Sequence, residues 1–101
     1  MRARVPTLSS KEALILELLL ARGELYGLQL VKASRRRLKR GTVYVTLGRM
    51  ENKGYVQSRL EAGPEREGGL PRRIYQATEL GAAVLTVWSR ALQQLQEEFA
   101  R

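Results

Sequence analysis

The stretch RRRLKRGTVYVTLGRM, residues 35–50, decides the fold of this chain, because two structures compete for it. Its run VYVT at 43–46 is rich in β-branched and aromatic residues, which favours a strand. Three apolar residues of the same region instead recur at the i, i+4, i+7 spacing of one helix face: Val43, Leu47 and Met50. A helix over 40–53 also accounts for more of the sequence and ends naturally at Gly54. We therefore predict a helix here.

Basic residues crowd the start of this helix. Five of the six residues 35–40 are Lys or Arg, and residues 32–49 hold seven basic residues and no acidic one. The whole net charge of +8 lies in residues 1–54, since residues 55–101 carry six basic and six acidic residues. A charged run is often only solvated, but this density without counter-charges favours a polyanionic partner. Nucleic acid is the first candidate and an anionic membrane surface the second.

The composition argues against catalysis. The 101 residues suit a single domain, and they include no Cys, His or Asp. The commonest general base and the commonest transition-metal ligands are thus missing, and no pattern groups the Glu residues into a site. We expect no enzymatic activity, no metal and no cofactor. Because no apolar run reaches the length of a membrane span and no signal peptide is visible, we expect a soluble, cytoplasmic protein with no membrane partner.

Two further helices are predicted before the basic run. After a short basic arm at 1–8, Ser9 and Glu12 have the spacing of a capping box, and the apolar helix that they begin ends at Gly23. This helix is apolar almost all round, which predicts burial on more than one side, partly against a second subunit. Residues 25–34 predict a second helix. Its apolar face consists of Leu25, Leu28 and Val31.

The segments after Gly54 predict a hairpin and a long helix. Residues 55–61 alternate in polarity, residues 72–77 form the return strand, and the glycines between them indicate a long turn. The tip at 61–67 holds three Glu and one Arg, which suits contact with phosphate poorly. Thr78 caps a final helix that runs to the end of the chain and carries one apolar stripe. The stripe consists of Leu80, Val84, Trp88, Ala91, Leu95 and Phe99.

This order of elements is that of a winged helix-turn-helix dimer, a mainly α (α+β) fold with a two-stranded β wing. We assign residues 1–78 to a DNA-binding unit and residues 79–101 to a long C-terminal dimerisation helix of the same compact unit. The helix spans roughly 35 Å at about 1.5 Å per residue. So small a core cannot cover it, and a second copy of the chain is expected to bury its stripe. The third helix would enter the major groove of double-stranded DNA, with the basic run on phosphates beside it.

Three segments together resemble PadR-type transcriptional regulators. ILELLLARGELYGLQL (15–30) resembles the family's first two helices, GTVYVTLGRMENKGYV (41–56) its third helix, and GGLPRRIYQATELG (68–81) the return strand of its wing. One departure is Val45, where the family usually has Pro. The resemblance implies a winged-helix regulator of the short form with a single C-terminal helix. It also implies a homodimer on an inverted-repeat operator, with repression as the common mode of action.

The residues expected to bind DNA are Arg35, Arg36, Arg37, Lys39, Arg40, Thr42, Tyr44, Thr46, Arg49, Arg72 and Arg73. The cluster at 35–40 would contact phosphates, whereas Thr42 and Thr46 would influence the choice of sequence. Arg72 and Arg73 are adjacent strand residues that point to opposite faces, so one can face DNA while the other pairs with a Glu.

Two of these residues have an alternative. The resemblance and the spacing place Tyr44 near DNA, and a tyrosine packed on the hairpin is the alternative. Arg49 either reaches a phosphate or pairs with Glu51 or Glu12.

The dimer interface is expected on the apolar stripe, with Trp88 at its middle. Trp88 is either a packed interface residue or, as in drug-sensing relatives, part of the wall of a cavity for a small aromatic effector. Two other functions stay open, namely a winged-helix module for protein–protein interaction and an RNA-binding protein. Salt-sensitive binding of nucleic acid would argue against the first, and the lack of interleaved exposed aromatic residues argues against the second.

Overall fold

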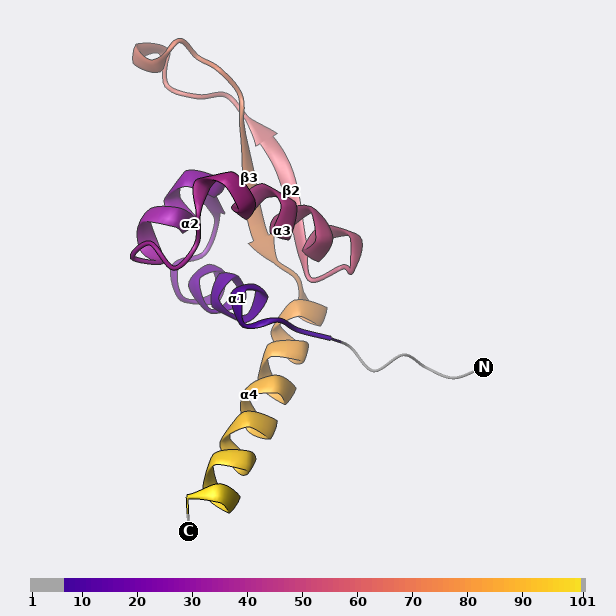
Figure 1. The fold of residues 1–101 in the computed structure, drawn as a ribbon. Coiled ribbons are helices and arrows are strands. Elements are labelled where there is room, and N and C mark those ends of the chain that lie inside the picture. The colour runs from indigo at the N-terminus through magenta and orange to yellow at the C-terminus, as the bar shows by residue number, and fades with distance from the viewer. Residues whose placement is uncertain (1–6, 101) are drawn as a thin grey trace.

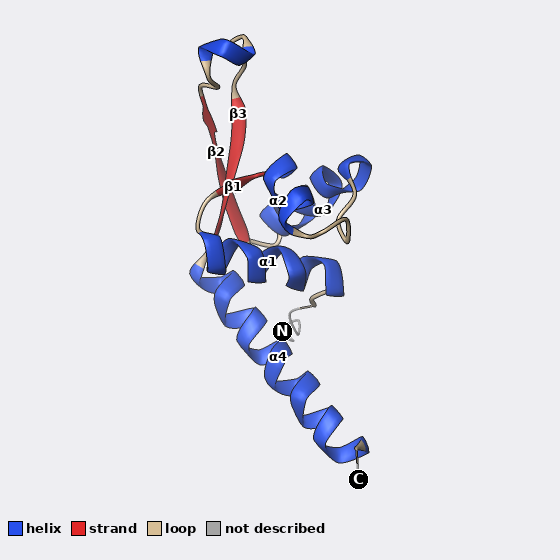
Figure 2. Ribbon diagram, turned by 90° about the vertical axis from the view of Figure 1, so that its left-hand side faces the viewer, coloured by secondary structure: helices blue, strands red, loops and turns tan. Residues whose placement is uncertain are grey.

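Three short helices cover one face of a small antiparallel sheet, and a fourth helix runs away from this body (Figure 1; Figure 2). The computed structural model describes residues 7–100, without the side chain of Glu67, so residues 1–6 of the predicted arm lie outside it. The elements are α1 (Ser10–Arg22), β1 (Leu25–Tyr26), α2 (Gly27–Ala33), α3 (Arg40–Asn52), β2 (Val56–Glu61), the 3-10 helix η1 (Glu65–Glu67), β3 (Arg72–Ala77) and α4 (Glu79–Phe99). This is the predicted winged helix-turn-helix, with one additional strand.

The start of α1 is the predicted capping box. The Ser9 hydroxyl accepts a hydrogen bond from the Glu12 amide at 3.1 Å, and the Glu12 carboxylate accepts one from the Ser9 amide at 2.8 Å. Two otherwise orphaned amides of the first turn are thereby satisfied. The inner face of α1 lies at the centre of the core, where Ile15, Leu16 and Leu19 are buried. Leu20, by contrast, is 49% exposed.

The second predicted helix begins later than expected, and of its predicted apolar face only Leu28 is exposed, since Leu25 is buried and Val31 packs against the core. Leu25 lies in β1, opposite Tyr75 of β3, so the sheet has three strands in the order β1-β3-β2, and β1 is added to the predicted two-stranded wing of β2 and β3. In α2 the buried side chain is that of Leu30, whereas Leu28 is 42% exposed. The physical reason is non-local: backbone hydrogen bonds to β3 hold the segment at Leu25 extended, and this shifts the helix start to Gly27.

The competition between strand and helix at 43–46 is resolved in favour of the helix. Helix α3 contains the whole run, and its predicted inner side chains, Val43, Leu47 and Met50, are all buried. Burial of this face outweighs the strand propensity of the β-branched residues. After the helix, Gly54 adopts a left-handed φ of +81°, which turns the chain into β2.

A tight junction joins the end of α3 to the start of α4. The Thr78 hydroxyl caps α4 by accepting from the Gly81 amide at 3.0 Å, and it donates to the Gly54 carbonyl at 2.5 Å. The Thr78 amide donates to the Tyr55 carbonyl at 3.0 Å. Gly81 packs so closely there that a Cβ would overlap the Tyr55 carbonyl oxygen. The base of α4 is therefore fixed directly to the chain that leaves α3.

Candidate nucleic-acid interface

A buried serine organises the turn between α2 and α3. Ser34 is fully buried, and its hydroxyl donates to the Val31 carbonyl at 2.7 Å while accepting from the Leu38 amide at 2.9 Å. The Leu38 side chain is buried too and anchors the far end of the turn. Between these two buried residues, the side chains at 35–37 are exposed to solvent. The turn thus presents the densest part of the basic run outward.

Two arginines of this turn adopt an unusual backbone conformation. Arg35 has a φ of +54° and Arg36 a φ of +72°, in the left-handed region that favours glycine. For a residue with a Cβ this conformation costs roughly 1–2 kcal/mol. Glycine would remove that cost, yet the sequence has arginine at both positions. Arg35 and Arg36 therefore hold backbone strain at an exposed basic turn.

The outward face of α3 carries the side chains available to a partner. Thr42 and Val45 are exposed, and Thr46 is half-buried. The Thr46 hydroxyl donates to the Thr42 carbonyl at 3.3 Å, and the Thr42 hydroxyl to the Lys39 carbonyl at 3.4 Å. Each hydroxyl donates back to its own helix and keeps oxygen lone pairs with which to accept a hydrogen bond.

Arg49 is exposed on the same helix, and neither of its predicted ion pairs forms within residues 7–100. Glu12 binds Lys53 instead, and Glu51 accepts a hydrogen bond from Ser58 at 2.8 Å. Contact of Arg49 with a phosphate therefore stays a prediction.

A groove of about 550 Å³ opens between α2, the first half of α3 and β3. It is lined by Tyr26, Leu28, Gln29, Lys32, Tyr44, Pro71, Arg72 and Arg73. Three of these side chains are cationic, and none of the described lining residues is acidic. The Arg72 guanidinium lies over the Tyr26 ring, 4.6 Å from its centroid, which is a cation–π contact. The groove is therefore an electropositive corner beside α3.

The wing is fixed to α3 by a short chain of polar contacts. An Arg73 guanidinium nitrogen donates to the Ser58 hydroxyl at 3.0 Å, and that hydroxyl donates to the Glu51 carboxylate. Arg72 and Arg73 thus reach different neighbours, as expected for adjacent strand residues. Burial, with the Glu51 carboxylate nearby, raises the pKa of Tyr75 above its ordinary value. Hydrogen bonds thus connect the wing base to α3.

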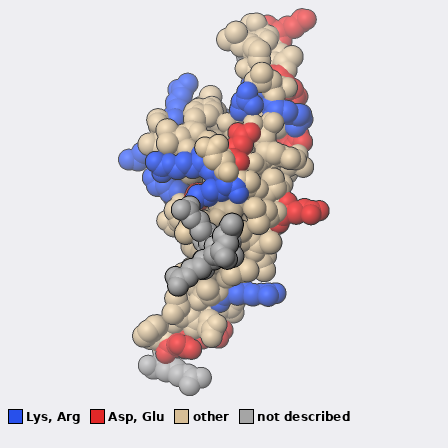
Figure 3. Space-filling view, turned by 90° about the vertical axis from the view of Figure 1, so that its right-hand side faces the viewer, with Lys and Arg blue, Asp and Glu red and all other residues tan. Residues whose placement is uncertain are grey.

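Charge is unevenly distributed over the surface. Figure 3 shows many of the visible Lys and Arg side chains gathered over the helical body, while acidic side chains lie at the wing tip, near the end of α4 and at scattered points between them. On the wing, Arg59 pairs with Glu24 at 2.8 Å and with Glu61 at 3.4 Å, so its charge is balanced locally. The positive surface available to a polyanion is therefore the turn, α3 and the groove.

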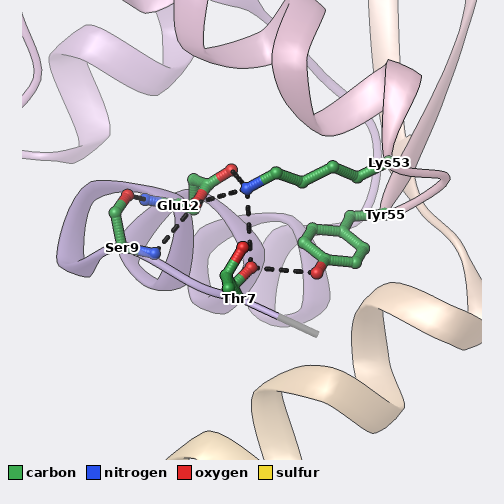
Figure 4. A network of polar contacts seen from close by, with 5 residues as sticks. All are labelled: Thr7, Ser9, Glu12, Lys53 and Tyr55. Atoms are coloured by element: carbon green, nitrogen blue, oxygen red, sulfur yellow. Dashed lines mark hydrogen bonds and ion pairs between the residues drawn. The ribbon is translucent and has the colours of Figure 1, made fainter. Parts of the chain in front are cut away.

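A polar network holds the C-terminal end of α3 against the start of α1 (Figure 4). The Lys53 ammonium lies 2.9 Å from a carboxylate oxygen of Glu12, and the Tyr55 hydroxyl donates to the Thr7 carbonyl at 2.9 Å. Burial favours the neutral form of Glu12, but the hydrogen bond from the Ser9 amide and the Lys53 ammonium outweigh it. Together they hold the pKa of Glu12 below its ordinary value of 4.5.

Comparison with known proteins identifies the family. The model of the transcriptional regulator PadR-like family matches residues 15–87, which include the turn, α3 and the whole wing. The chain belongs to the PadR-like family of transcriptional regulators. A search of curated proteins found no match.

Solved structures of PadR regulators share the fold. A PadR family transcription regulator from Clostridium difficile is 28% identical, with a TM-score of 0.71 over 92% of this chain and 100% of that chain. A PadR family transcriptional regulator from Eggerthella lenta is 26% identical, with a TM-score of 0.73 over 89% of this chain and 80% of that chain. Within residues 7–100 of the PadR-like chain, no helix has the length and hydropathy needed to cross a bilayer.

The apolar stripe of α4 in this PadR-like chain is not one uniform exposed surface. Val84 is buried in the core of its own subunit, and Trp88 is half-buried against the same core. The prediction that a second subunit buries Val84 is therefore wrong, because the first turns of α4 pack against the core of their own subunit. Beyond Trp88, all residues of α4 are exposed, among them Leu95 at 52% and Phe99 at 83%.

The groove of this PadR-like protein also contains residues that were not predicted from the sequence. Tyr26, Gln29 and Lys32 line the groove together with the predicted Tyr44, Arg72 and Arg73. Gln29 and Lys32 are three residues apart, which places them on one face of α2. This spacing was the sequence signal that could have grouped them. Tyr44 is 49% exposed, and its ring lies against Gly27 of α2. The side chain is therefore partly packed, but on α2 as well as beside the hairpin.

Proposed function

We propose that this PadR-like regulator binds double-stranded DNA in a sequence-specific manner, as a homodimer on an inverted-repeat operator, and acts as a repressor. The observation that carries the proposal is the juxtaposition of the exposed basic turn at 35–37, the outward face of α3 and the electropositive groove beside it. The convex helix suits the major groove, and the cations on either side suit phosphates.

Each cluster is assigned its own role. The arginines at 35–37, with Lys39 and Arg40, neutralise phosphates, which adds affinity for any sequence. Thr42 and Thr46 lie on the outward face of α3, where a hydroxyl can contact a base edge. Arg49 and the groove cations contact the backbone on the other side of α3.

Dimerisation is proposed to proceed through the outer half of α4. From Ser89 to Phe99 this helix makes no tertiary contact that buries its side chains, although it carries Leu92, Leu95 and Phe99. A helix end of about three turns is marginal in water without packing. A second copy of α4 would bury this surface and place two recognition helices about 34 Å apart, in successive major grooves.

The test of DNA binding compares two sets of variants on a selected operator and on a scrambled duplex. Arg35→Ala, Arg36→Ala and Arg37→Ala should weaken binding to both duplexes alike, and each lost contact should reduce the slope of log K against log salt by roughly 0.9. Thr42→Val and Thr46→Val should instead change the preference between the duplexes. Equal effects of both sets on both duplexes would contradict the assignment, and preference for single-stranded RNA would favour an RNA-binding function.

The test of the dimer uses charge on the apolar surface. Leu95→Glu with Phe99→Glu should give monomers in sedimentation at micromolar concentration. Ser89→Glu with Gln93→Glu adds the same charges, also four residues apart, on the side of α4 away from the stripe and should leave dimers. A monomeric wild type would exclude the proposed interface. Because Trp88 is partly shielded by its own subunit, its fluorescence should shift only modestly to the red on dissociation.

We further propose that a small aromatic effector regulates DNA binding. A planar compound that stacks on Trp88 near the interface would bias the relative angle of the two DNA-binding units. Such compounds should quench Trp88 and reduce operator affinity together. Quenching without a change in operator affinity would show that the site is not regulatory.

A further inference from the structure

The side chain of Tyr44 is seated on a glycine of the neighbouring helix. If Gly27, the first residue of α2, carried a Cβ, that atom would lie 2.5 Å from Cε1 and from Cζ of Tyr44 and 2.6 Å from its hydroxyl oxygen. Real Cβ atoms essentially never come this close to another heavy atom. The outer end of the tyrosine ring therefore occupies the space that any larger residue at position 27 would need.

The space taken up by the Tyr44 ring, and not the backbone conformation, accounts for glycine at position 27. Gly27 is not among the glycines with a left-handed φ, which are Gly23, Gly54, Gly68 and Gly69. It begins a helix, where alanine has the higher intrinsic propensity. Local structure would thus favour alanine at position 27, and the contact with Tyr44 is what opposes it.

The seat determines where the Tyr44 hydroxyl lies. Tyr44 remains 49% exposed and lines the electropositive groove with Lys32, Arg72 and Arg73. Within the described chain, its hydroxyl makes no hydrogen bond. A phenol donor held beside three cationic side chains matches the chemistry of a phosphodiester oxygen, which accepts from neutral and charged donors together.

We infer that Gly27 is a positioning residue for DNA binding: by leaving room for the Tyr44 ring, it places the Tyr44 hydroxyl in the groove as a donor to a backbone phosphate. The inference rests on the proposed function and makes it more specific, because it assigns the groove to phosphate and gives Tyr44 its role. Alanine at position 27 would push the ring end out of its seat. The fold should survive, since the atoms that must move are the far end of one side chain.

The experiment is a double-mutant cycle on a random-sequence duplex at low salt, because a phosphate contact requires no particular operator. Tyr44→Phe should weaken binding about tenfold, as expected for one hydrogen bond to a charged group. Gly27→Ala should weaken binding at least as much. Tyr44→Phe should then have no further effect in the Gly27→Ala background. Ser89→Ala is the control: Ser89 is exposed on α4, outside the turn at 35–37, α3 and the groove, so this variant should retain the affinity of the wild type.

Two further measurements separate positioning from simple packing. The midpoint of thermal unfolding of Gly27→Ala should stay close to that of the wild type. In NMR spectra of the free protein, the Hα resonances of Gly27 should carry a ring-current shift that disappears in Tyr44→Leu. Wild-type affinity of Gly27→Ala would overturn the inference, as would a Tyr44→Phe effect of equal size in both backgrounds. If the wild type binds no duplex at all, the proposed function fails, while the ring-current shift still decides whether Tyr44 sits on Gly27.

Discussion

Lys53 and Glu12 join the last turn of α3 to the first turn of α1, with the ammonium nitrogen 2.9 Å from a carboxylate oxygen. Glu12 is only 5% exposed, so its charge is largely removed from water and depends on these partners. The same carboxylate completes the capping box with Ser9. One side chain thus stabilises the start of α1 and holds the end of α3 against it.

This pair predicts a pH dependence of stability. Because the pKa of Glu12 is lowered in the folded state, its ionisation stabilises the fold above about pH 4.5, and the contribution is lost as the pH falls through the folded pKa. Glu12→Gln should lower the free energy of unfolding at neutral pH by roughly 1–3 kcal/mol. The difference from the wild type should shrink in urea unfolding at low pH. Glu17→Gln, an exposed change in the same helix, should show neither effect.

Ser34→Ala should destabilise the helix-turn-helix. The substitution removes the acceptor of the buried Leu38 amide, and an unsatisfied buried donor costs about 1–3 kcal/mol. Chemical denaturation of Ser34→Ala and of the exposed control Ser89→Ala measures this cost. Equal stability of the two variants would show that the turn does not depend on the buried hydroxyl.

Arg36→Gly should separate stability from DNA affinity. Glycine relieves the left-handed φ of +72°, so the free energy of unfolding should stay constant or rise by up to about 1 kcal/mol. Affinity for random duplex should fall at the same time, because a phosphate contact is lost. Arg36→Val, which adds a β-branched side chain at this φ, should lose both stability and affinity. A parallel loss of both in Arg36→Gly would argue against strain at this position.

Gly81→Ala should weaken the junction between α3 and α4. The added methyl would overlap the Tyr55 carbonyl oxygen, which belongs to the backbone and cannot move aside cheaply. We expect a loss of roughly 1–3 kcal/mol in thermal or chemical unfolding. Gly48→Ala, in open space within a helix, should instead gain up to about 1 kcal/mol.

Local rules predicted the parts of the fold that depend on residues close in sequence. The Ser9 and Glu12 capping box follows from a spacing of three residues, and the buried face of α3 follows from helical periodicity. Thr78 was likewise recognisable as a cap. In each case the contacts that decide the structure lie within about two helical turns, so the sequence contains the necessary pattern.

Contacts between distant residues escaped this reasoning. The strand at Leu25–Tyr26 has only two residues and forms because β3 lies beside it. No local alternation of polar and apolar residues could therefore predict it. Glu12 finds its cation 41 residues away at Lys53, although Arg49 was the partner considered. The seat of Tyr44 on Gly27 and the left-handed arginines at 35 and 36 depend on how α2 and α3 pack. The cationic groove could not be foreseen for the same reason.

The tight junction between Gly54, Thr78 and Gly81 fixes the first turn of α4 to the rest of the subunit. The 21 residues of α4 extend about 30 Å from this junction at about 1.5 Å per residue. In a dimer joined at the far ends of two such helices, rotating each helix by about 10° about its far end would move the attached DNA-binding unit by about 5 Å, more than the roughly 3.4 Å rise of one base pair. The crossing angle of the paired helices would then act as a gauge of operator length, and substitutions far from DNA could retune which half-site spacing is accepted.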